Sequence, residues 1–428
     1  MNLRRYIKGD RIIWAVILIL FIVSLLSVYS STGSLAYKYR SGDTLYYLFR
    51  QLRYVVLGLV VIFFFHLVPY KVFSRVSMTI IYIAAPLLLF TLFKGESRNE
   101  AARWLMIPGT GLTIQPSDFA KVALVMFVAK VLSVNQNNIK DFKGVFLKLA
   151  VAVSIICALI LPANFSTAAI VFVTAFTLMF IGRVPFKHLF LFVAVGIAGL
   201  GLFLLLSSAM SKEGRISTWK NRIEAFIDGG GDNYQADQAK VAVVRGGLFP
   251  NGPGTSTQRN LLPHPYSDFI YAIIIEEYGS LIGGVLLLAL YLWLLFRTGL
   301  IVRKSKSTYA AFLAFGLTLG LVLQAFVNMG VAVGLLPVTG QTLPLVSMGG
   351  SSILFNSMAM GMILSVSWGI KKELEEEAQA EEAVQAAEEP LQQDQTREMK
   401  QDQKKRMIKN LRDNRPEDIR RDEQGEEI

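Results

Sequence analysis

The sequence has few of the residues that build disulfides and metal cages. It contains one cysteine, Cys157, inside an apolar run, and three scattered histidines, His66, His188 and His264. A single cysteine excludes an internal disulfide and a cysteine-based metal cage. The histidines give poor support to a histidine-rich metal site. These residues therefore indicate neither a cysteine-based nor a histidine-rich metal site.

The N-terminus also lacks the pattern of a cleavable secretory signal peptide. The first apolar run starts near Ile12, and no small-residue cleavage pattern occurs before Tyr29. We expect this run to remain in the protein as a membrane anchor.

Apolar residues are abundant and occur in blocks. The 428 residues are 53% hydrophobic, and the runs are roughly 17–25 residues long, the length that spans a bilayer. The sequence predicts an all-α polytopic membrane protein with about ten transmembrane helices. The expected spans are 11–30, 53–69, 75–94, 118–134, 145–162, 166–182, 186–208, 269–297, 308–333 and 350–370.

The net charge of +11 does not indicate a nucleic-acid partner, because the basic residues flank apolar runs instead of forming one stripe. They alternate between connections so that all fall on one side of the membrane. The positive-inside rule then places both termini in the cytoplasm. The residues in question are Arg4, Arg5, Lys8, Arg11, Lys71, Arg75, Lys140, Lys143, Arg183, Lys187, Arg297, Arg303, Lys304 and Lys306.

Three long loops fall on the opposite side, at residues 95–117, 209–268 and 334–349. Loops of this length in a compact protein are usually functional or disordered. Within the largest, between spans seven and eight, residues 215–228 carry an apolar stripe. This segment is either a helix on the outer membrane face or a helix packed on the loop itself.

The composition changes after residue 370. The membrane domain is expected to cover residues 1–370, and residues 371–428 form an acidic and then basic tail. The tail has too few large apolar residues to bury a core, so it is predicted to be cytoplasmic and mostly disordered or transiently helical.

Three carboxylates occur at the start of the eighth span, in SDFIYAIIIEEYGS. On a helix, Asp268 and Glu276 lie about 80° apart and could face one cavity, and Glu277 points elsewhere. Asp268 is either a helix N-cap or a reactive group at the membrane surface. The glutamates are either buried structural acids or members of the same site, because ionisable groups within a span are costly.

A second polar cluster combines ARW at 102–104 with QPSDFAK at 115–121. Asp118 and Lys121 are spaced to form an ion pair within one helix. Alternatively, Arg103 and Lys121 face outward and bind an anion, since both side chains suit phosphate.

Two further stretches are rich in glycine and proline. The backbone of VVRGGLFPNGPGTSTQRNLLP (243–263) could approach a phosphate closely, although no P-loop pattern is present. LPVTGQTLPLVSMGGSS (336–352) has irregular backbone at membrane level, which is tolerated where it lines a cavity. Its serines, Ser347, Ser351 and Ser352, lack a hydrolase motif, and packing or substrate binding is the better interpretation.

Together these stretches resemble the SEDS family of peptidoglycan glycosyltransferases over about residues 11–370. The resemblance depends on ARWLMIPGTGLTIQPSDFAK, on GGLFPNGPGTSTQRNLLP followed by SDFIYAIIIEEYGSLIGG, and on LLPVTGQTLPLVSMGGSS. It implies an enzyme that polymerises lipid II at the outer face of the bacterial cytoplasmic membrane. The growing glycan would be transferred from undecaprenyl pyrophosphate to the next lipid II.

The resemblance also implies roles for individual residues. Asp268 matches the family's essential aspartate and would be the general base. Arg103 and Lys121 would stabilise the pyrophosphate leaving group. Gln115, Asp118, Arg259, Glu276, Ser347 and Ser351 complete the expected substrate-binding set. A divalent cation, Mg or Mn, would be an optional cofactor, and a class B penicillin-binding transpeptidase and other division proteins would be partners.

Some positions depart from the family pattern. Tyr266 replaces a frequent histidine, Asp118 a glutamate, Arg259 a lysine and Asn164 an aspartate. GQTLPLVSMGGSS is more similar to the division type, FtsW, than to the elongation type, RodA. Septal wall synthesis is therefore the expected role, with elongation as the alternative.

Two other functions are compatible with a polytopic lipid II protein: a flippase and a non-catalytic scaffold that activates a transpeptidase. A flippase needs a polar path to both leaflets. Here the intramembrane charges gather on the outer half, which favours the enzyme.

Overall fold

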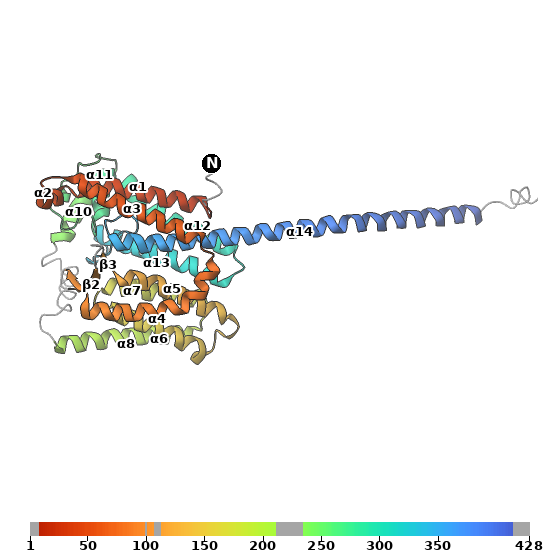
Figure 1. Ribbon diagram of the computed structural model, residues 1–428, viewed down its shortest axis with the longest axis horizontal. Helices are drawn as coiled ribbons and strands as arrows, with labels where there is room; N and C mark the ends of the chain where they lie inside the picture. The colour runs from red at the N-terminus through yellow and green to blue at the C-terminus, as the bar shows by residue number, and fades with distance from the viewer. Residues whose placement is uncertain (1–7, 99–100, 107–112, 211–233, 414–428) are drawn as a thin grey trace, which may run out of the picture. The chain divides into compact units, whose positions relative to one another are not determined.

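The computed structural model describes residues 8–98, 101–106, 113–210 and 234–413. The chain divides into two compact units, Met1–Ile370 and Lys371–Ile428. In the first unit, long helices run side by side in both directions (Figure 1). The predicted all-α polytopic fold is confirmed.

The long helices follow the predicted apolar runs. Those of the first unit are α1 (Arg11–Ser31), α3 (Thr44–Leu67), α4 (Tyr70–Lys94), α5 (Pro116–Val134), α6 (Leu147–Ile160), α7 (Phe165–Ile181), α8 (Phe186–Met210), α12 (Leu287–Arg303), α13 (Thr308–Ala332) and the start of α14 (Gly350–Asp413). A π-helical turn, Phe142–Phe146, leads into α6.

Seven helical segments of the described chain are long and apolar enough to cross a membrane, and two shorter apolar helices, Phe165–Ile181 and Phe186–Leu202, accompany them. α5 falls outside both groups, since Asp118, Lys121 and Lys130 lie within its 19 residues. Ten membrane spans therefore stay a prediction.

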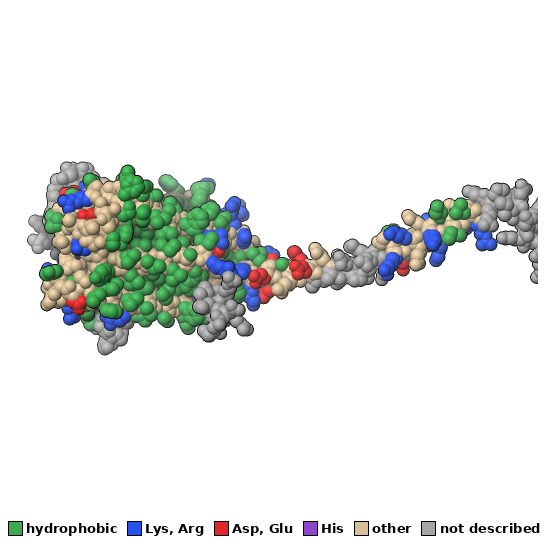
Figure 2. All heavy atoms as spheres, turned by 90° about the horizontal axis from the view of Figure 1, so that it is seen from above, with side chains coloured by type: hydrophobic (Ala, Val, Ile, Leu, Met, Phe, Trp, Pro, Cys, Tyr) green, Lys and Arg blue, Asp and Glu red, His purple; other side chains and the backbone are tan. Residues whose placement is uncertain are grey.

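The surface of the first unit matches a bilayer environment. Figure 2 shows a broad hydrophobic belt across its middle, with polar and charged side chains at both ends. Large side chains in this belt are strongly exposed, for example Phe64 at 64%, Phe190 at 78% and Ile197 at 68%. Such a surface is costly in water but matches hydrocarbon.

α13 occupies the centre of the bundle and packs against α5, α7, α12 and the outer helices α10 (Tyr234–Gly246) and α11 (Ile270–Tyr278). Close packing depends on small residues: a Cβ on Gly316 would lie 2.7 Å from Leu178 and 2.8 Å from Val125. Two amides, Gln324 and Asn328, are buried on this otherwise apolar helix. They lie one turn apart, so α13 presents polar groups on one face near its end.

The predicted eighth span is broken. α11 ends at Tyr278, a π-helical segment covers Gly279–Leu286, and α12 then continues to Arg303. Gly279 has φ +73°, and a Cβ there would lie 2.6 Å from the backbone of Phe249. Glycine is required because the chain turns and the loop passes against it.

The loop before α11 forms hydrogen bonds with the backbone groups that the break leaves without helical partners. The amide N–H groups of Asn251 and Gly252 donate to the Glu277 carbonyl, and Ser280 donates to Gly247. The Asn251 side chain donates to the Glu276 carbonyl. The glycine-rich loop therefore caps a helix end within the apolar region, where unpaired carbonyls would be costly.

Smaller elements cover the end of the bundle where α10 lies (Figure 1). A three-stranded antiparallel sheet joins β1 (Glu96–Arg98), β2 (Ala101–Met106) and β3 (Thr113–Ile114) in that order. The short helix α2 (Gly33–Arg40) and the 3₁₀ turn η4 (Gln258–Asn260) contact each other. The predicted amphipathic segment 215–228 lies outside the described residues.

An ion pair joins α1 and α12 at the opposite end of the bundle. Asp10 caps α1 by accepting from the backbone of Ile12 and Ile13. Its second oxygen accepts two bonds from Arg297, at 2.9 and 2.6 Å. Both bonds go to the same carboxylate oxygen, and such charge-assisted bonds are stronger than neutral ones, so they hold α1 and α12 together.

Residues 371–413 are helical as part of α14; that this tail is mostly disordered or transiently helical stays a prediction. Their side chains are mainly exposed, and spaced pairs such as Lys371–Glu375 and Lys372–Glu376 support the helix. The acidic, alanine-rich composition lacks a core but has high helix propensity.

Candidate active site

Asp268 lies in a turn directly before α11. The helix begins at Ile270, its N-cap is Phe269, and no side chain caps it. Capping is therefore not the reason for a carboxylate at this position. The prediction that Asp268 and Glu276 lie about 80° apart on one helix is wrong, because α11 begins at Ile270 and Asp268 is outside it.

Three consecutive carbonyls hold this turn in place. The Tyr266 carbonyl accepts from the Met348 amide at 2.9 Å. The Ser267 carbonyl accepts from the Ser347 hydroxyl at 2.6 Å, and the Asp268 carbonyl from the Asn328 amide at 2.8 Å. The backbone around the aspartate is thus fixed by other elements.

The segment before this turn and the 334–349 loop beside it have unusual backbone geometry. His264 and Leu345 have φ angles of +56° and +63°, and Gly340 has φ +67°. Non-glycine residues in this region store strain and are concentrated at functional sites. A Cβ on Gly340 would lie 3.6 Å from Oδ2 of Asp268, so the backbone of the 334–349 loop passes close to the carboxylate.

The carboxylate is half-buried and has polar neighbours. Its Oδ1 accepts from the Ser267 hydroxyl at 2.9 Å. Burial raises the pKa of the Tyr266 phenol above its ordinary value, and the nearby Tyr47 and Asp268 raise that pKa further. Tyr266 thus stays protonated beside the aspartate and can donate a hydrogen bond.

The Tyr266 position is one of the departures from the family pattern. The Nδ1 atom of His264 lies 3.1 Å from the Tyr266 hydroxyl, and the two rings meet edge to face. His264, two residues earlier in the chain, therefore contacts the residue that replaces the frequent histidine.

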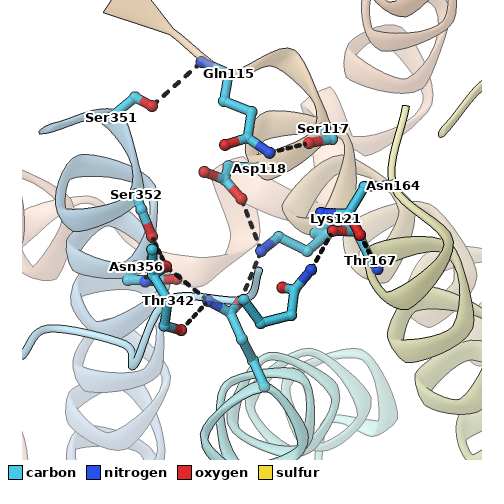
Figure 3. Close-up of polar contacts among 12 residues, drawn as sticks. Gln115, Ser117, Asp118, Lys121, Asn164, Thr167, Thr342, Ser351, Ser352 and Asn356 are labelled. Atoms are coloured by element: carbon cyan, nitrogen blue, oxygen red, sulfur yellow. Dashed lines mark hydrogen bonds and ion pairs between the residues drawn. The ribbon is translucent and has the colours of Figure 1, made fainter. Parts of the chain in front are cut away.

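Lys121 is the centre of a second polar group, shown in Figure 3. Its ammonium pairs with Oδ1 of Asp118 at 2.8 Å and donates to Gln324 at 2.7 Å. The predicted ion pair within α5 is present. Among the described residues no third acceptor is bonded to this ammonium, so one N–H remains for a ligand.

The pair is largely buried. The side chains of Lys121 and Asp118 are 17% and 7% exposed, and Oδ2 of Asp118 has no partner among the described residues. Burying charges is expensive unless their bonding capacity is filled. An orphaned carboxylate oxygen beside a cation is typical of a site that binds a further polar group.

α13 connects the two groups. Gln324 accepts from Lys121 and donates to the Thr342 carbonyl at 2.9 Å. One turn along, about 6 Å, the Asn328 amide donates to the carbonyls of Asp268 and Gln341. The aspartate and the lysine are therefore held by adjacent turns of one rigid helix.

The 334–349 loop extends this network. Thr342 bonds Ser352 at 3.1 Å, and Asn356 donates to Ser352 at 3.2 Å. Gln341 donates to Thr167 at 2.9 Å, whose backbone in turn donates to Asn164, the N-cap of α7. At this departure from the family pattern, the amide acts as a helix cap.

The cleft beside Lys121 is narrow. Asp118, Lys121, Gln324 and Asn356 form its polar end, and α5, α7 and α13 supply apolar walls. It holds about 40 Å³, room for only a few water molecules at ~10–15 Å³ each. A sugar or pyrophosphate would enter only if these walls move apart.

Glu276 and Glu277 both support the fold in this structure. Glu276 is buried and accepts from the Ser256 hydroxyl and from the backbone of Thr257 and Gln258. Glu277 is fully buried and accepts from the Ser30 hydroxyl on α1. Both acids thus fix the 247–260 loop and α1 around α11, away from the Asp268 turn.

The other predicted site residues are spread over several elements. Arg259 donates to the Ser30 carbonyl at 3.1 Å and lies against α1. Gln115 directly precedes α5, and its backbone N–H donates to the Ser351 hydroxyl at 3.2 Å. Arg103 is in β2, and its side chain lies outside the described residues. The structure therefore brings Asp118, Lys121, Gln115 and Ser351 together and Arg259 with the glutamates.

The sequence interpretation missed the buried amides, chiefly Gln324 and Asn328. That interpretation considered only ionisable groups within apolar spans. The signal it lacked is in the sequence: Gln324 and Asn328 are amides four residues apart in an apolar helix. For metals, no group of three His, Cys, Asp or Glu side chains converges within the described part of the chain.

Comparison with known protein families gives a match over most of the chain. The model of the cell cycle proteins FtsW, RodA and SpoVE matches residues 10–372. Stage V sporulation protein E of Bacillus subtilis (strain 168) is 35% identical over 364 residues, covering 84% of this chain and 96% of the relative. The probable peptidoglycan glycosyltransferase FtsW of Coxiella burnetii is 33% identical over 367 residues, covering 83% and 95%.

Solved structures show the same fold. A peptidoglycan synthase complex that coordinates polymerization and crosslinking includes a chain that matches with a TM-score of 0.62 and 24% identity, covering 84% of this chain and 97% of that one. The rod shape determining protein RodA of Thermus thermophilus matches with a TM-score of 0.59 and 24% identity, covering 85% and 98%.

Proposed function

Because the chain belongs to the family of FtsW, RodA and SpoVE, we propose that Asp268 is the general base of a peptidoglycan glycosyltransferase. The activity follows from relatives at about 32% identity over most of the chain that are named peptidoglycan glycosyltransferases. The protein is a multi-pass bacterial membrane protein. The observation that supports Asp268 is the way its turn is held. Three of its carbonyls accept hydrogen bonds from other elements, and α13, which supplies one of the donors, also bonds Lys121.

The proposed donor is a glycan on undecaprenyl pyrophosphate, and the acceptor is the 4-hydroxyl of lipid II. Asp268 removes the hydroxyl proton while the oxygen attacks the anomeric carbon. The bond to the pyrophosphate breaks with inversion. This is the logic of an inverting glycosidase, with a sugar in place of water.

The departing pyrophosphate needs positive charge. Lys121 bonds Gln324, one turn of α13 from the Asn328 that holds the Asp268 carbonyl, and Arg103 in β2 is proposed to reach the same anion. Gln115, Asp118 and Ser351 would orient the head group beside them. A Mg or Mn ion, if used, would be held mainly by pyrophosphate oxygens with one or two carboxylates.

We further propose that the site faces the outside of the cytoplasmic membrane and that the enzyme builds septal wall. The orientation is supported by the distribution of basic residues over alternate connections. A class B penicillin-binding transpeptidase is the proposed partner, by analogy with the synthase complex whose chain shares the fold.

The decisive test is polymerisation of labelled lipid II by the purified protein with its transpeptidase. Asp268→Asn keeps the size of the side chain but cannot accept the proton, so product formation is expected to fall ~10²–10⁴-fold. Asp237→Asn, at an exposed pair with Lys240 on α10, is the matched control and should retain activity.

Full polymerisation by Asp268→Asn would refute the general-base role. If the wild type never polymerises but moves lipid II between leaflets of liposomes, the protein is a flippase instead. Depletion in cells separates the subtypes: filaments indicate septal synthesis, and rounded cells indicate elongation.

A further inference from the structure

A second cavity lies away from the active site, between α7, α12 and α13. It holds about 400 Å³, within the range of ligand sites, against about 40 Å³ for the cleft at Lys121. Its walls are apolar, with Phe296 and Phe315 among them, and Arg303 is its one charged lining residue in the described chain.

Gly299 keeps this groove open. It lies inside α12, where glycine destabilises a helix by roughly 0.5–1 kcal/mol relative to alanine. A Cβ at Gly299 would meet no atom within 4 Å, so protein packing does not require glycine there. The missing side chain leaves space that the described protein does not use.

Arg303 is placed at the rim of the groove, as the last residue of α12. It is exposed, and no acceptor in the described residues forms a hydrogen bond or ion pair with its guanidinium. A guanidinium binds phosphate through two parallel hydrogen bonds. Under the proposed orientation this rim is at the cytoplasmic surface, where anionic lipid head groups are concentrated.

We propose that the groove is a binding site for an anionic phospholipid of the cytoplasmic leaflet. One acyl chain lies between Phe296 and Phe315 over Gly299, and the phosphate binds Arg303. The groove extends along Phe296–Arg303, about 12 Å of helix, less than half of the ~30 Å that a partner's membrane helix would cover. A single lipid chain with its head group fits this length.

The test is native mass spectrometry of the full-length protein in detergent, with dioleoyl phosphatidylglycerol or dioleoyl phosphatidylcholine added. The wild type should bind phosphatidylglycerol several-fold more than phosphatidylcholine. Arg303→Gln should abolish that preference, and Gly299→Leu should fill the groove and lower binding of both lipids several-fold.

Two variants serve as controls. Lys304→Gln makes the same change of charge next to the groove without lining it, and should keep the preference. Gly199→Leu, on α8 with equally open space, should keep both lipids bound. Equal effects of Arg303→Gln and Lys304→Gln, or of the two leucine variants, would overturn the proposal.

A membrane protein cross-linked from a photoreactive residue at 299 would also overturn the proposal. That outcome would identify the groove as a surface for a partner helix. A cross-link to lipid would support the site. The thermal unfolding temperature of each variant is measured as well, so that a loss of lipid binding can be distinguished from a loss of folding.

Discussion

Asn328 tests how the turn at Asp268, the proposed general base, is held in place. Its amide donates to the carbonyls of Asp268 and Gln341, at 2.8 and 2.7 Å, from a side chain that is 1% exposed. Asn328→Asp keeps the shape but replaces the donor with an oxygen, and Asn328→Ala removes it.

The expected size of the effect follows from these two bonds. Each buried acceptor left without a donor costs about 1–3 kcal/mol, so the turn loses roughly 2–6 kcal/mol of support. Because a displacement of ~1 Å in a reacting group costs about 10²-fold in rate, we expect kcat to fall by about that factor. KM for lipid II should change little, since Lys121 and its partners stay in place.

The measurement is the steady-state polymerisation rate over a range of lipid II concentrations, together with thermal unfolding. Thr318→Ala on the same helix is the control: it removes a buried hydroxyl bonded to Thr298. That variant should lose stability but keep kcat. If both Asn328 variants kept more than half of kcat, or behaved like Thr318→Ala, the positioning role would be refuted.

Three further results are expected. Glu276→Ala leaves the Ser256 and Thr257 donors unpaired and should lower the unfolding temperature in a thermal melt, whereas Asp268→Asn should not. Gly340→Ala forces a side chain into a left-handed conformation 3.6 Å from the carboxylate, and should lower polymerisation more than stability in paired assays. The pKa of Tyr266 is raised in the folded protein, so its contribution to stability is complete below pH 10 and is lost as pH rises through the folded value; alkaline unfolding of Tyr266→Phe should lack this slope.

The sequence predicted where most of the long apolar helices lie, because hydrocarbon imposes length and composition on each span. The runs at Arg11–Ser31 and Thr308–Ala332 differ from the expected ranges by one residue at most. The break at Gly279 was missed, since one glycine in an apolar run does not by itself indicate a break. Its cause is tertiary: the Leu248–Phe249 backbone packs against it.

The candidate site was predictable in part. Asp268 and Lys121 were recognised as candidates because they are charged residues at apolar segments. Burying a charge is costly, so such residues usually have a function. Glu276 was marked by the same argument, yet it bonds the 256–258 loop. Single-chain reasoning cannot separate these cases, because the deciding contacts join residues distant in sequence.

The π-helical segment Gly279–Leu286 lets the bundle tolerate a change in residue count. Such segments carry the equivalent of an inserted residue within an α-helix. Because the wide turn absorbs that residue, deleting it would restore an α-helix without rotating the residues beyond it. Deleting one residue of α12 ahead of Arg297 would instead rotate everything beyond it by about 100° about the helix axis. Arg297 would then leave Asp10, and the groove at Gly299 would face a different neighbour. Relatives that differ by one residue in the π-helical segment are therefore expected to present the same side of α12 to the lipid.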